Sequence, residues 1–129
     1  MRILVDADFL IALAKSDDSN HKKALILAEN FKGSFFFTTQ FTLPKSATVL
    51  SYKVSHKDAV SFLLRSRKLS LVELPFDDKL RDATDLLFYS QKKKGTSWID
   101  CLNIVSVKTY NLDGILSFDK FYKKHIHVF

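Results

Sequence analysis

The chain of 129 residues carries 20 Lys and Arg against 14 Asp and Glu, a formal net charge of +6, and 47% of its residues are hydrophobic. This length and composition predict a single domain, residues 1–129, that folds without a disulfide or a structural metal. Its one cysteine, Cys101, cannot form an internal bridge. No apolar run approaches the roughly 20 residues that span a bilayer. The start Met-Arg-Ile-Leu-Val-Asp has too short an apolar run before its acid to be a secretion signal. We expect a cytoplasmic protein that does not bind membrane.

The positive charge favours a polyanionic partner such as nucleic acid, because Lys and Arg neutralise phosphates and release the ions condensed around them. Charge alone does not separate a nucleic-acid-binding protein from other small basic proteins. The position of the acids sharpens the inference, since acids follow apolar strands while the exterior is basic. A metal-dependent nuclease needs this distribution, because its surface must attract phosphate and its centre must hold cations.

Short apolar runs alternate with segments of helical spacing along the whole chain. We predict strands at residues 2–5, 34–39, 69–74, 114–118 and 126–129. We predict helices at residues 8–15, 41–53 and 98–110, a helix capped by Ser19 or Asn20, and helices that begin at Ser55-His-Lys-Asp and Phe76-Asp-Asp. This order predicts an α/β fold, a three-layer α/β/α sandwich with a mainly parallel central sheet.

Three acids stand where they can share one site. Asp6 directly follows the first strand, Asp119 follows the fourth, and Asp100 lies in the first turn of the helix at 98–110. In a parallel sheet the carboxyl ends of the strands face the ligand crevice, so we expect these three carboxyl groups to converge there. Each also has a plainer interpretation as a helix cap or a first-turn acid, and the same holds for Asp8. Together the three predict a site for a hard divalent cation.

Three segments resemble the first, third and fourth acidic motifs of PIN domains, and those of VapC-type toxins most closely. They are Ile3-Leu-Val-Asp-Ala-Asp-Phe-Leu-Ile-Ala-Leu, Ser97-Trp-Ile-Asp-Cys-Leu-Asn-Ile and Ile115-Leu-Ser-Phe-Asp-Lys-Phe. The resemblance covers essentially the whole chain. It implies an endoribonuclease that depends on Mg²⁺ or Mn²⁺ and hydrolyses RNA phosphodiester bonds. It also implies a homodimer and an antitoxin protein as partner.

The same resemblance assigns roles to individual residues. Asp6, Asp100 and Asp119 correspond to metal ligands of the family, and Ser97 and Ser117 match hydroxyl positions that flank those acids. We therefore expect all five at the catalytic site.

Lys45 stands where the family has its fourth acid. The family places a Glu on the helix after the second strand, and the run Thr38-Thr-Gln-Phe-Thr-Leu-Pro-Lys-Ser-Ala-Thr-Val-Leu matches that pattern with Lys45 at the Glu position. An ammonium in place of a carboxylate changes the local charge by two units and opposes a second metal ion. Lys45 either turns away, which leaves three acids for one metal, or pairs with Asp6 or Asp119 and replaces the cation. The first case predicts a weakened nuclease, and the second a catalytically inactive PIN-like module that binds RNA or protein.

Basic residues near the crevice are candidates for phosphate contacts. Lys120, Lys123 and Lys124 directly follow Asp119, so we expect them at the crevice mouth and in contact with nucleic acid. Lys92-Lys-Lys is expected to be a solvated helix end, with a phosphate contact as the alternative.

Overall fold

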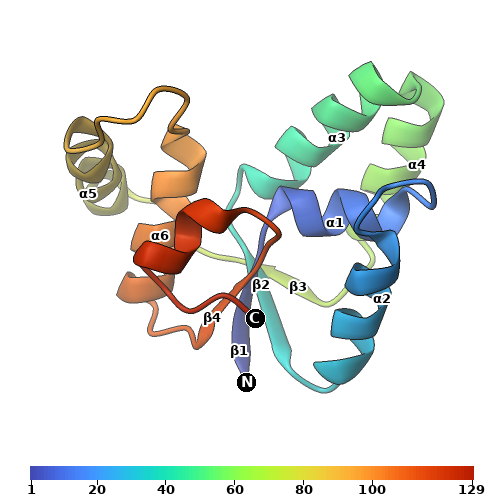
Figure 1. Cartoon of the computed structure of the whole chain (residues 1–129), viewed down its shortest axis with the longest axis horizontal. Helices are drawn as coiled ribbons and strands as arrows, with labels where there is room; N and C mark the ends of the chain where they lie inside the picture. The colour runs from blue at the N-terminus through green and yellow to red at the C-terminus, as the bar shows by residue number, and fades with distance from the viewer.

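The computed structural model of the protein describes residues 1–129. Strands and helices alternate along the chain, as Figure 1 shows. In chain order they are β1 (Arg2–Val5), α1 (Ala7–Ala14), α2 (His21–Asn30), β2 (Phe35–Thr38), α3 (Thr42–Lys53), α4 (His56–Ser66), β3 (Leu71–Glu73), α5 (Asp78–Tyr89), α6 (Trp98–Thr109), β4 (Gly114–Leu116) and the 3₁₀ helix η1 (Lys120–Lys124). None of the helices is both long and apolar enough to cross a bilayer.

The sheet has the strand order β3-β2-β1-β4, and all three pairings are parallel. Ile3 of β1 lies opposite Phe36 of β2 on one side and Gly114 of β4 on the other. The chain moves from β1 outward through β2 to β3 and then returns to the far side of β1 to form β4. The two strands at the centre of this reversal, β1 and β4, therefore border the place where α/β proteins bind ligands.

Helices cover both faces of the sheet. Ile3 and Val5 of β1 pack with the apolar sides of α1 to α4, whereas Leu4, between them in sequence, packs with α6 and Tyr122 on the opposite face. Alternate residues of a strand point to opposite faces, so one apolar run supplies two cores. This arrangement confirms the predicted three-layer α/β/α sandwich with a parallel sheet.

Side-chain caps fix where the helices begin. Ser55 accepts a hydrogen bond from the backbone N–H of Asp58, 3.0 Å away, and Asp77 accepts one from Leu80 at 2.8 Å, as the sequence predicted. The predicted cap of α2 is only positional, since Asn20 precedes the helix without a side-chain cap. His21 instead ties α2 to α1, because its Nδ1 lies 2.6 Å from the carbonyl oxygen of Ala12.

The predicted strand at 126–129 is reduced to a single bridge between Val128 and Ile115. Residues 120–124 wind into η1, and the chain beyond it pairs with β4 only around Ile115. The close approach of this tail requires a glycine in β4. A Cβ on Gly114 would lie 2.6 Å from the carbonyl oxygen of His127, which is inside van der Waals contact.

Candidate active site

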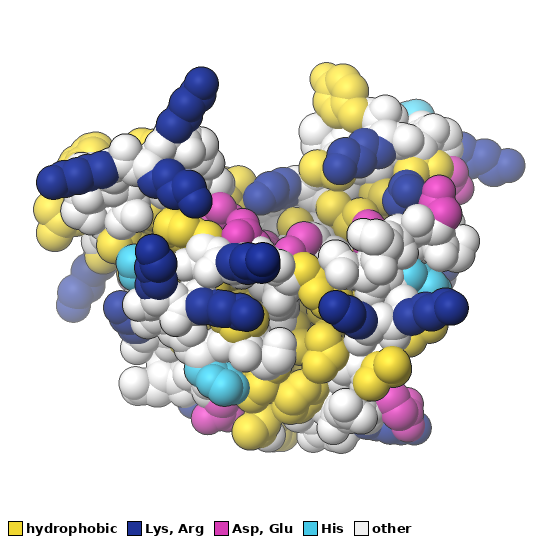
Figure 2. Space-filling view, viewed as in Figure 1, with side chains coloured by type: hydrophobic (Ala, Val, Ile, Leu, Met, Phe, Trp, Pro, Cys, Tyr) yellow, Lys and Arg dark blue, Asp and Glu magenta, His cyan; other side chains and the backbone are white.

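Acids gather at the edge of the sheet where β1 and β4 end. Figure 2, viewed as Figure 1, shows acidic side chains on the floor of a hollow between the α5 and α6 side and the α3 and α4 side, with basic side chains around it. Asp6 follows β1 and caps α1, and Asp119 follows β4 and caps η1. Asp6 and Asp119 therefore each cap a helix and also lie at the same edge of the sheet. We call this hollow, with Asp6, Asp8, Asp100 and Asp119, the acidic crevice.

Asp6 is the most buried of these acids, with 5% of its surface exposed. Its Oδ1 accepts hydrogen bonds from the backbone N–H of Ala7 at 2.7 Å and from Nδ2 of Asn103 at 3.1 Å. Its Oδ2 lies 3.1 Å from the Ser117 hydroxyl and 3.0 Å from the Tyr122 hydroxyl. When both hydroxyls turn toward it, all four lone-pair directions of the carboxylate are used.

Tyr122 joins Asp6 to Asp100. Its hydroxyl lies 3.0 Å from Asp6 Oδ2 and 2.9 Å from Asp100 Oδ1, and it accepts a hydrogen bond from Asn103 Nδ2 at 2.9 Å. A hydroxyl carries one proton, so it donates to only one of the two carboxylates at a time. Burial, followed by the charges of Asp6 and Asp100, raises the pKa of Tyr122 far above its ordinary value. The phenol therefore stays protonated and acts as a donor.

Ser117 joins Asp6 to Asp8 in the same way. Its hydroxyl lies 3.1 Å from Asp6 Oδ2 and 3.0 Å from Asp8 Oδ2, and it accepts a hydrogen bond from the Asp119 backbone N–H at 3.1 Å. Asp8 Oδ2 also accepts from the backbone N–H of Phe118, while its Oδ1 is buried without a partner. Burial, and then the charge of Asp6, raises the pKa of Asp8 to about 7. Asp8 is thus part of the acid network and not only a first-turn helix acid.

Asp100 and Asp119 face a small pocket of about 140 Å³. It is also lined by Lys93 and Lys94 from the loop before α6, and by Phe121. Burial raises the pKa of Asp100, the hydrogen bond from Tyr122 opposes this, and the charge of Asp119 adds to the increase. A pocket lined by two acids and two lysines offers residue types that bind cations and phosphate.

Lys45, on α3, lies close enough to the crevice for its charge to act on Asp100, where it works against the effect of burial and lowers the pKa. It takes part in none of the ion pairs of the molecule, so it is not locked to Asp6 or Asp119. Its side chain is half-buried. The ammonium is therefore part of the electrostatic surroundings of the acids without neutralising any one of them.

The remaining predicted site residues lie around this centre. Ser97 caps α6 by accepting from the backbone N–H groups of Ile99 and Asp100, so it positions Asp100 through the backbone. Lys120, Lys123 and Lys124 are exposed on η1, beside Asp119 in sequence but outside the pocket that Asp100 and Asp119 line. Lys93 and Lys94, for which a solvated helix end was expected, are exposed but lie in the loop after α5, which ends at Tyr89, and they line that pocket.

Two residues of the network had no sequence signal that distinguished them from core residues, Asn103 and Tyr122. Asn103 lies three residues after Asp100 on α6, so helical spacing places it on the same side, but an amide at this position is compatible with many roles. Tyr122 is fully buried among apolar side chains, and only the fold brings its hydroxyl to Asp6, 116 residues away in sequence.

The free carboxylate oxygens of the crevice fit a hydrated Mg²⁺ held by two acids. Mg²⁺ prefers carboxylate oxygens, keeps several waters and is often held by one or two carboxylates plus substrate phosphate. Asp100 Oδ2 and Asp119 Oδ2 make no hydrogen bond within the protein and are not buried. No group of three acids, histidines or thiols forms a ready-made metal centre. Direct coordination by Asp6 as well requires Ser117 or Tyr122 to turn away, and it stays a prediction.

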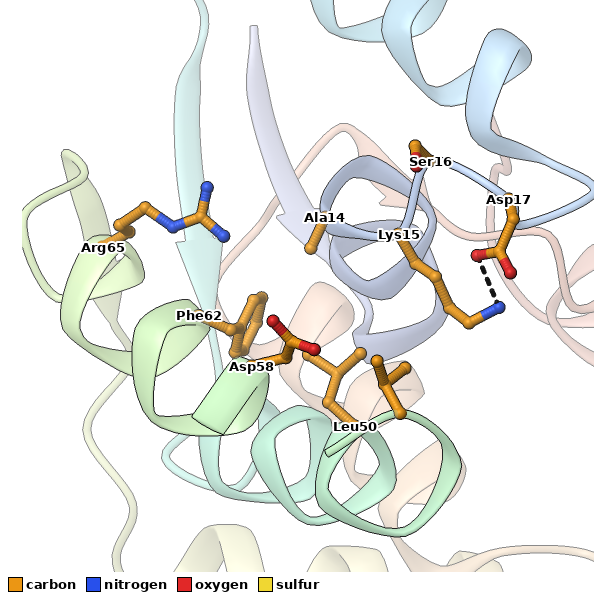
Figure 3. A pocket seen from close by; sticks show the side chains of 9 residues that line it. Ala14, Lys15, Ser16, Asp17, Leu50, Asp58, Phe62 and Arg65 are labelled. Atoms are coloured by element: carbon orange, nitrogen blue, oxygen red, sulfur yellow. Dashed lines mark ion pairs between the residues drawn. The ribbon is translucent and has the colours of Figure 1, made fainter. Parts of the chain in front are cut away.

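A larger cavity of about 220 Å³ lies elsewhere, between the end of α1 and the helices α3 and α4 (Figure 3). Lys15 and Asp17 form an ion pair of 2.8 Å at its rim, and Asp58 and Arg65 reach in from α4 beside Phe62. None of the acids of the crevice lines it. Its charged groups come from the loop after α1 and from α4 and surround no strand end, so we do not assign the chemistry to it.

The fold and the crevice define an α/β protein with an acidic site at the switch point of a parallel sheet. The sequence pattern of the PIN domain matches residues 3–125, so the chain belongs to the PIN domain family. No curated protein sequence gives a significant match to the chain.

Two solved structures share the fold over nearly their whole length. One is VapC20 of Mycobacterium tuberculosis, described as a toxin that cleaves the sarcin-ricin loop, with a TM-score of 0.86, 18% identity and coverage of 97% of this chain and 96% of that one. The other is VapBC2 of Rickettsia felis bound to a DNA fragment from its promoter, with a TM-score of 0.72, 14% identity and coverage of 100% and 98%. The expected family and fold class are confirmed.

Proposed function

We propose that this protein is a PIN-type endoribonuclease of the VapC toxin class that hydrolyses RNA phosphodiester bonds in the acidic crevice with the help of Mg²⁺ or Mn²⁺. The observation that carries the proposal is the pocket in which Asp100 and Asp119 present free carboxylate oxygens beside Lys93 and Lys94. Membership of the PIN family and the likeness to VapC20 support it.

Each group at the site has a chemical task in this proposal. Lys93 and Lys94 attract the phosphate that is to be cleaved, because ammonium groups bind phosphate as point charges. Asp100 and Asp119 would hold a divalent ion, which would supply Lewis-acid polarisation of the phosphate and a more acidic water. Asp6 adds negative charge behind them.

Lys45 sets the expected strength of the activity. Its ammonium repels a cation near Asp100, and it brings no hard oxygen ligand of its own. We therefore expect the wild-type chain to bind metal and to cut RNA weakly.

The test is cleavage of a labelled single-stranded RNA by the purified chain with Mn²⁺ and with EDTA. We expect slow cleavage that EDTA stops and that Asp100→Asn abolishes. Asp17→Asn is the matched control, because Asp17 is an exposed acid outside the crevice, paired with Lys15. Cleavage that persists in EDTA, or that Asp100→Asn leaves unchanged, would contradict the proposal.

A second candidate is a catalytically inactive PIN-like module that binds RNA or protein. It is favoured by one observation, that Ser117, Tyr122 and Asn103 already surround the Asp6 carboxylate with donors where a cation would otherwise be expected. Calorimetric titration with Mn²⁺ separates the two candidates, because the enzyme must bind the ion at its acids and the module need not.

We also propose a homodimer and an antitoxin as partners. The support is the resemblance to VapC-type toxins, the solved VapBC2 structure, and exposed apolar side chains on two helices, Leu25 and Ile26 on α2 and Leu64 on α4. Sedimentation of the purified chain measures the first, with a dimer expected. Copurification with a tagged chain from its native host measures the second, with one small protein partner expected.

A further inference from the structure

Three aromatic side chains, Phe41, Phe76 and Trp98, lie together beside the acidic crevice and belong to neither core. Their rings contact one another edge to face, with centroid distances of 5.4 Å for Phe41 and Phe76, 5.8 Å for Phe41 and Trp98, and 6.2 Å for Phe76 and Trp98. None of the three packs in the two hydrophobic clusters on the faces of the sheet. Each ring is only partly buried.

The three residues reach this place from separate loops at one edge of the sheet. Phe41 follows β2, Phe76 follows β3, and Trp98 opens α6, which begins at the same edge because it leads back to the start of β4. The strands β2 and β3 extend from β1 on the side away from β4, so the aromatic group flanks the strand end that carries Asp6. The rings therefore form a wall at the acidic edge of the sheet.

Two of these aromatic residues lie close in sequence to charged residues of the crevice. Trp98 lies two residues before Asp100 in the first turn of α6. Phe41 lies one helical turn before Lys45, and its carbonyl oxygen accepts the backbone N–H of Lys45 at 3.0 Å. The indole of Trp98 is held in place because its Nε1 donates to Asp85 of α5 at 2.7 Å. A held ring beside free ammonium groups loses little conformational freedom when a flat ligand stacks on it.

We propose that Phe41, Phe76 and Trp98 form a stacking platform for the unpaired bases of single-stranded RNA, next to the phosphate that enters the acidic crevice. Aromatic rings bind splayed bases by stacking, and neighbouring lysines follow the backbone, which is the combination that single-stranded nucleic acid requires. Bases stacked inside a duplex do not offer their faces to such a wall. This proposal rests on the proposed function, because it specifies the substrate of the same site.

Trp98 is the only tryptophan in the chain, so its fluorescence reports directly on the platform. The test is titration of the wild-type protein in EDTA, where RNA stays intact, with a uridine 12-mer and with a 12-mer of the same charge that lacks bases. We expect the uridine oligomer to quench Trp98 fluorescence and the abasic oligomer to leave it unchanged. Equal quenching by both would overturn the proposal, because the contact would then involve only the backbone.

Substitutions test the platform without relying on Trp98. Phe76→Leu and Phe41→Leu keep apolar volume and remove the stacking face, and we expect each to weaken binding of labelled uridine 12-mer by at least about fivefold. Phe76→Tyr keeps an aromatic face and should bind with about the wild-type affinity. Tyr52→Ala is the control, since Tyr52 on α3 is an aromatic residue with 88% of its surface exposed and outside the platform. Unchanged affinity in both Leu variants would overturn the proposal.

The two proposals fail separately. If the platform variants lose RNA binding while no protein variant cleaves RNA with Mn²⁺, the platform stands and the nuclease function fails. If cleavage depends on Mn²⁺ and Asp100 while the Leu variants bind RNA as the wild type does, the nuclease function stands and the platform fails.

Discussion

The Tyr122 hydroxyl lies 3.0 Å from the carboxylate of Asp6 and 2.9 Å from that of Asp100, with one proton to donate to the two acids. Ser117 stands in the same relation to Asp6 and Asp8. The acids of the crevice are therefore linked into a row by hydroxyl groups. These carboxylates are partly buried, and removing them from water costs free energy. Hydrogen bonds from the amide of Asn103 and from backbone N–H groups reduce that cost.

The first prediction concerns the hydroxyl between Asp6 and Asp100. Tyr122→Phe keeps the ring and removes the only donor that Asp100 has from a side chain, and it leaves Asn103 without one acceptor. Urea unfolding should show a loss of about 1–3 kcal/mol of unfolding free energy, because buried polar groups lose their partners. Tyr89→Phe is the control, since Tyr89 is 75% exposed and should lose almost nothing. Equal stability of Tyr122→Phe and the wild type would mean that the hydroxyl does not hold the row together.

The second prediction concerns pH. The pKa of Asp8 in the folded protein is about 7, above its ordinary 3.8, so the folded state holds this proton more tightly than the unfolded state. The resulting stability is complete below the ordinary pKa and is lost as pH rises through about 7. Asp8→Asn cannot lose it, so the stability of the variant relative to the wild type should rise between about pH 4 and 7, by at most about 1.4 kcal/mol per pH unit. Urea unfolding of both proteins across this range measures the difference, and a constant difference would contradict the assignment.

Much of the fold could be predicted from the sequence, because its signals are local. Short apolar runs indicated the strands, and apolar residues at helical spacing indicated the helices. The caps Ser55 and Asp77 lie one turn from the groups that they bind. The strand at 126–129 was wrong in extent, because the 3₁₀ helix at 120–124 has no strong sequence signal and shortens the return of the tail.

The candidate site could be predicted only in part. Strand-end position was enough to bring Asp6 and Asp119 to one edge, since parallel strands end on the same side. The partners of Asp6 could not be found in this way, because Asn103 and Tyr122 lie 97 and 116 residues away and each would fit an ordinary core. The place of Lys93 and Lys94 depends on the path of the loop before α6, which composition does not determine.

The third prediction separates two groups of lysines. Lys93 and Lys94 line the pocket of Asp100 and Asp119, whereas Lys120, Lys123 and Lys124 lie exposed on η1. Binding of RNA weakens with salt, and the slope of log K against log salt concentration counts the phosphate contacts. Replacing a lysine that contacts a phosphate by Ala should make this slope shallower by about 0.7. We expect this reduction in both groups, and a loss of cleavage rate only for Lys93→Ala and Lys94→Ala. Fluorescence anisotropy at several salt concentrations measures binding, and a salt dependence that none of the variants alters would exclude the phosphate contacts.

The fourth prediction concerns the tail. Gly114→Ala places a methyl group 2.6 Å from the carbonyl oxygen of His127 and 2.9 Å from a ring carbon of Phe129. The tail must shift, so thermal and urea unfolding should show a loss of about 1–3 kcal/mol. Without the last three residues the methyl group meets no tail. Gly114→Ala should therefore destabilise the truncated protein less than it destabilises the full-length protein. No loss in Gly114→Ala would show that the tail does not pack on β4.

The most direct measurement of the central claim is Mn²⁺ binding and RNA cleavage by Lys45→Glu. The substitution removes an ammonium whose charge reaches Asp100 and supplies a hard oxygen ligand, so metal affinity and cleavage rate should both rise above those of the wild type. Asp6→Asn in the Lys45→Glu background should remove the gained activity. If Lys45→Glu neither binds Mn²⁺ more tightly nor cuts RNA, the crevice is not a metal-dependent nuclease site and the protein is a binding module.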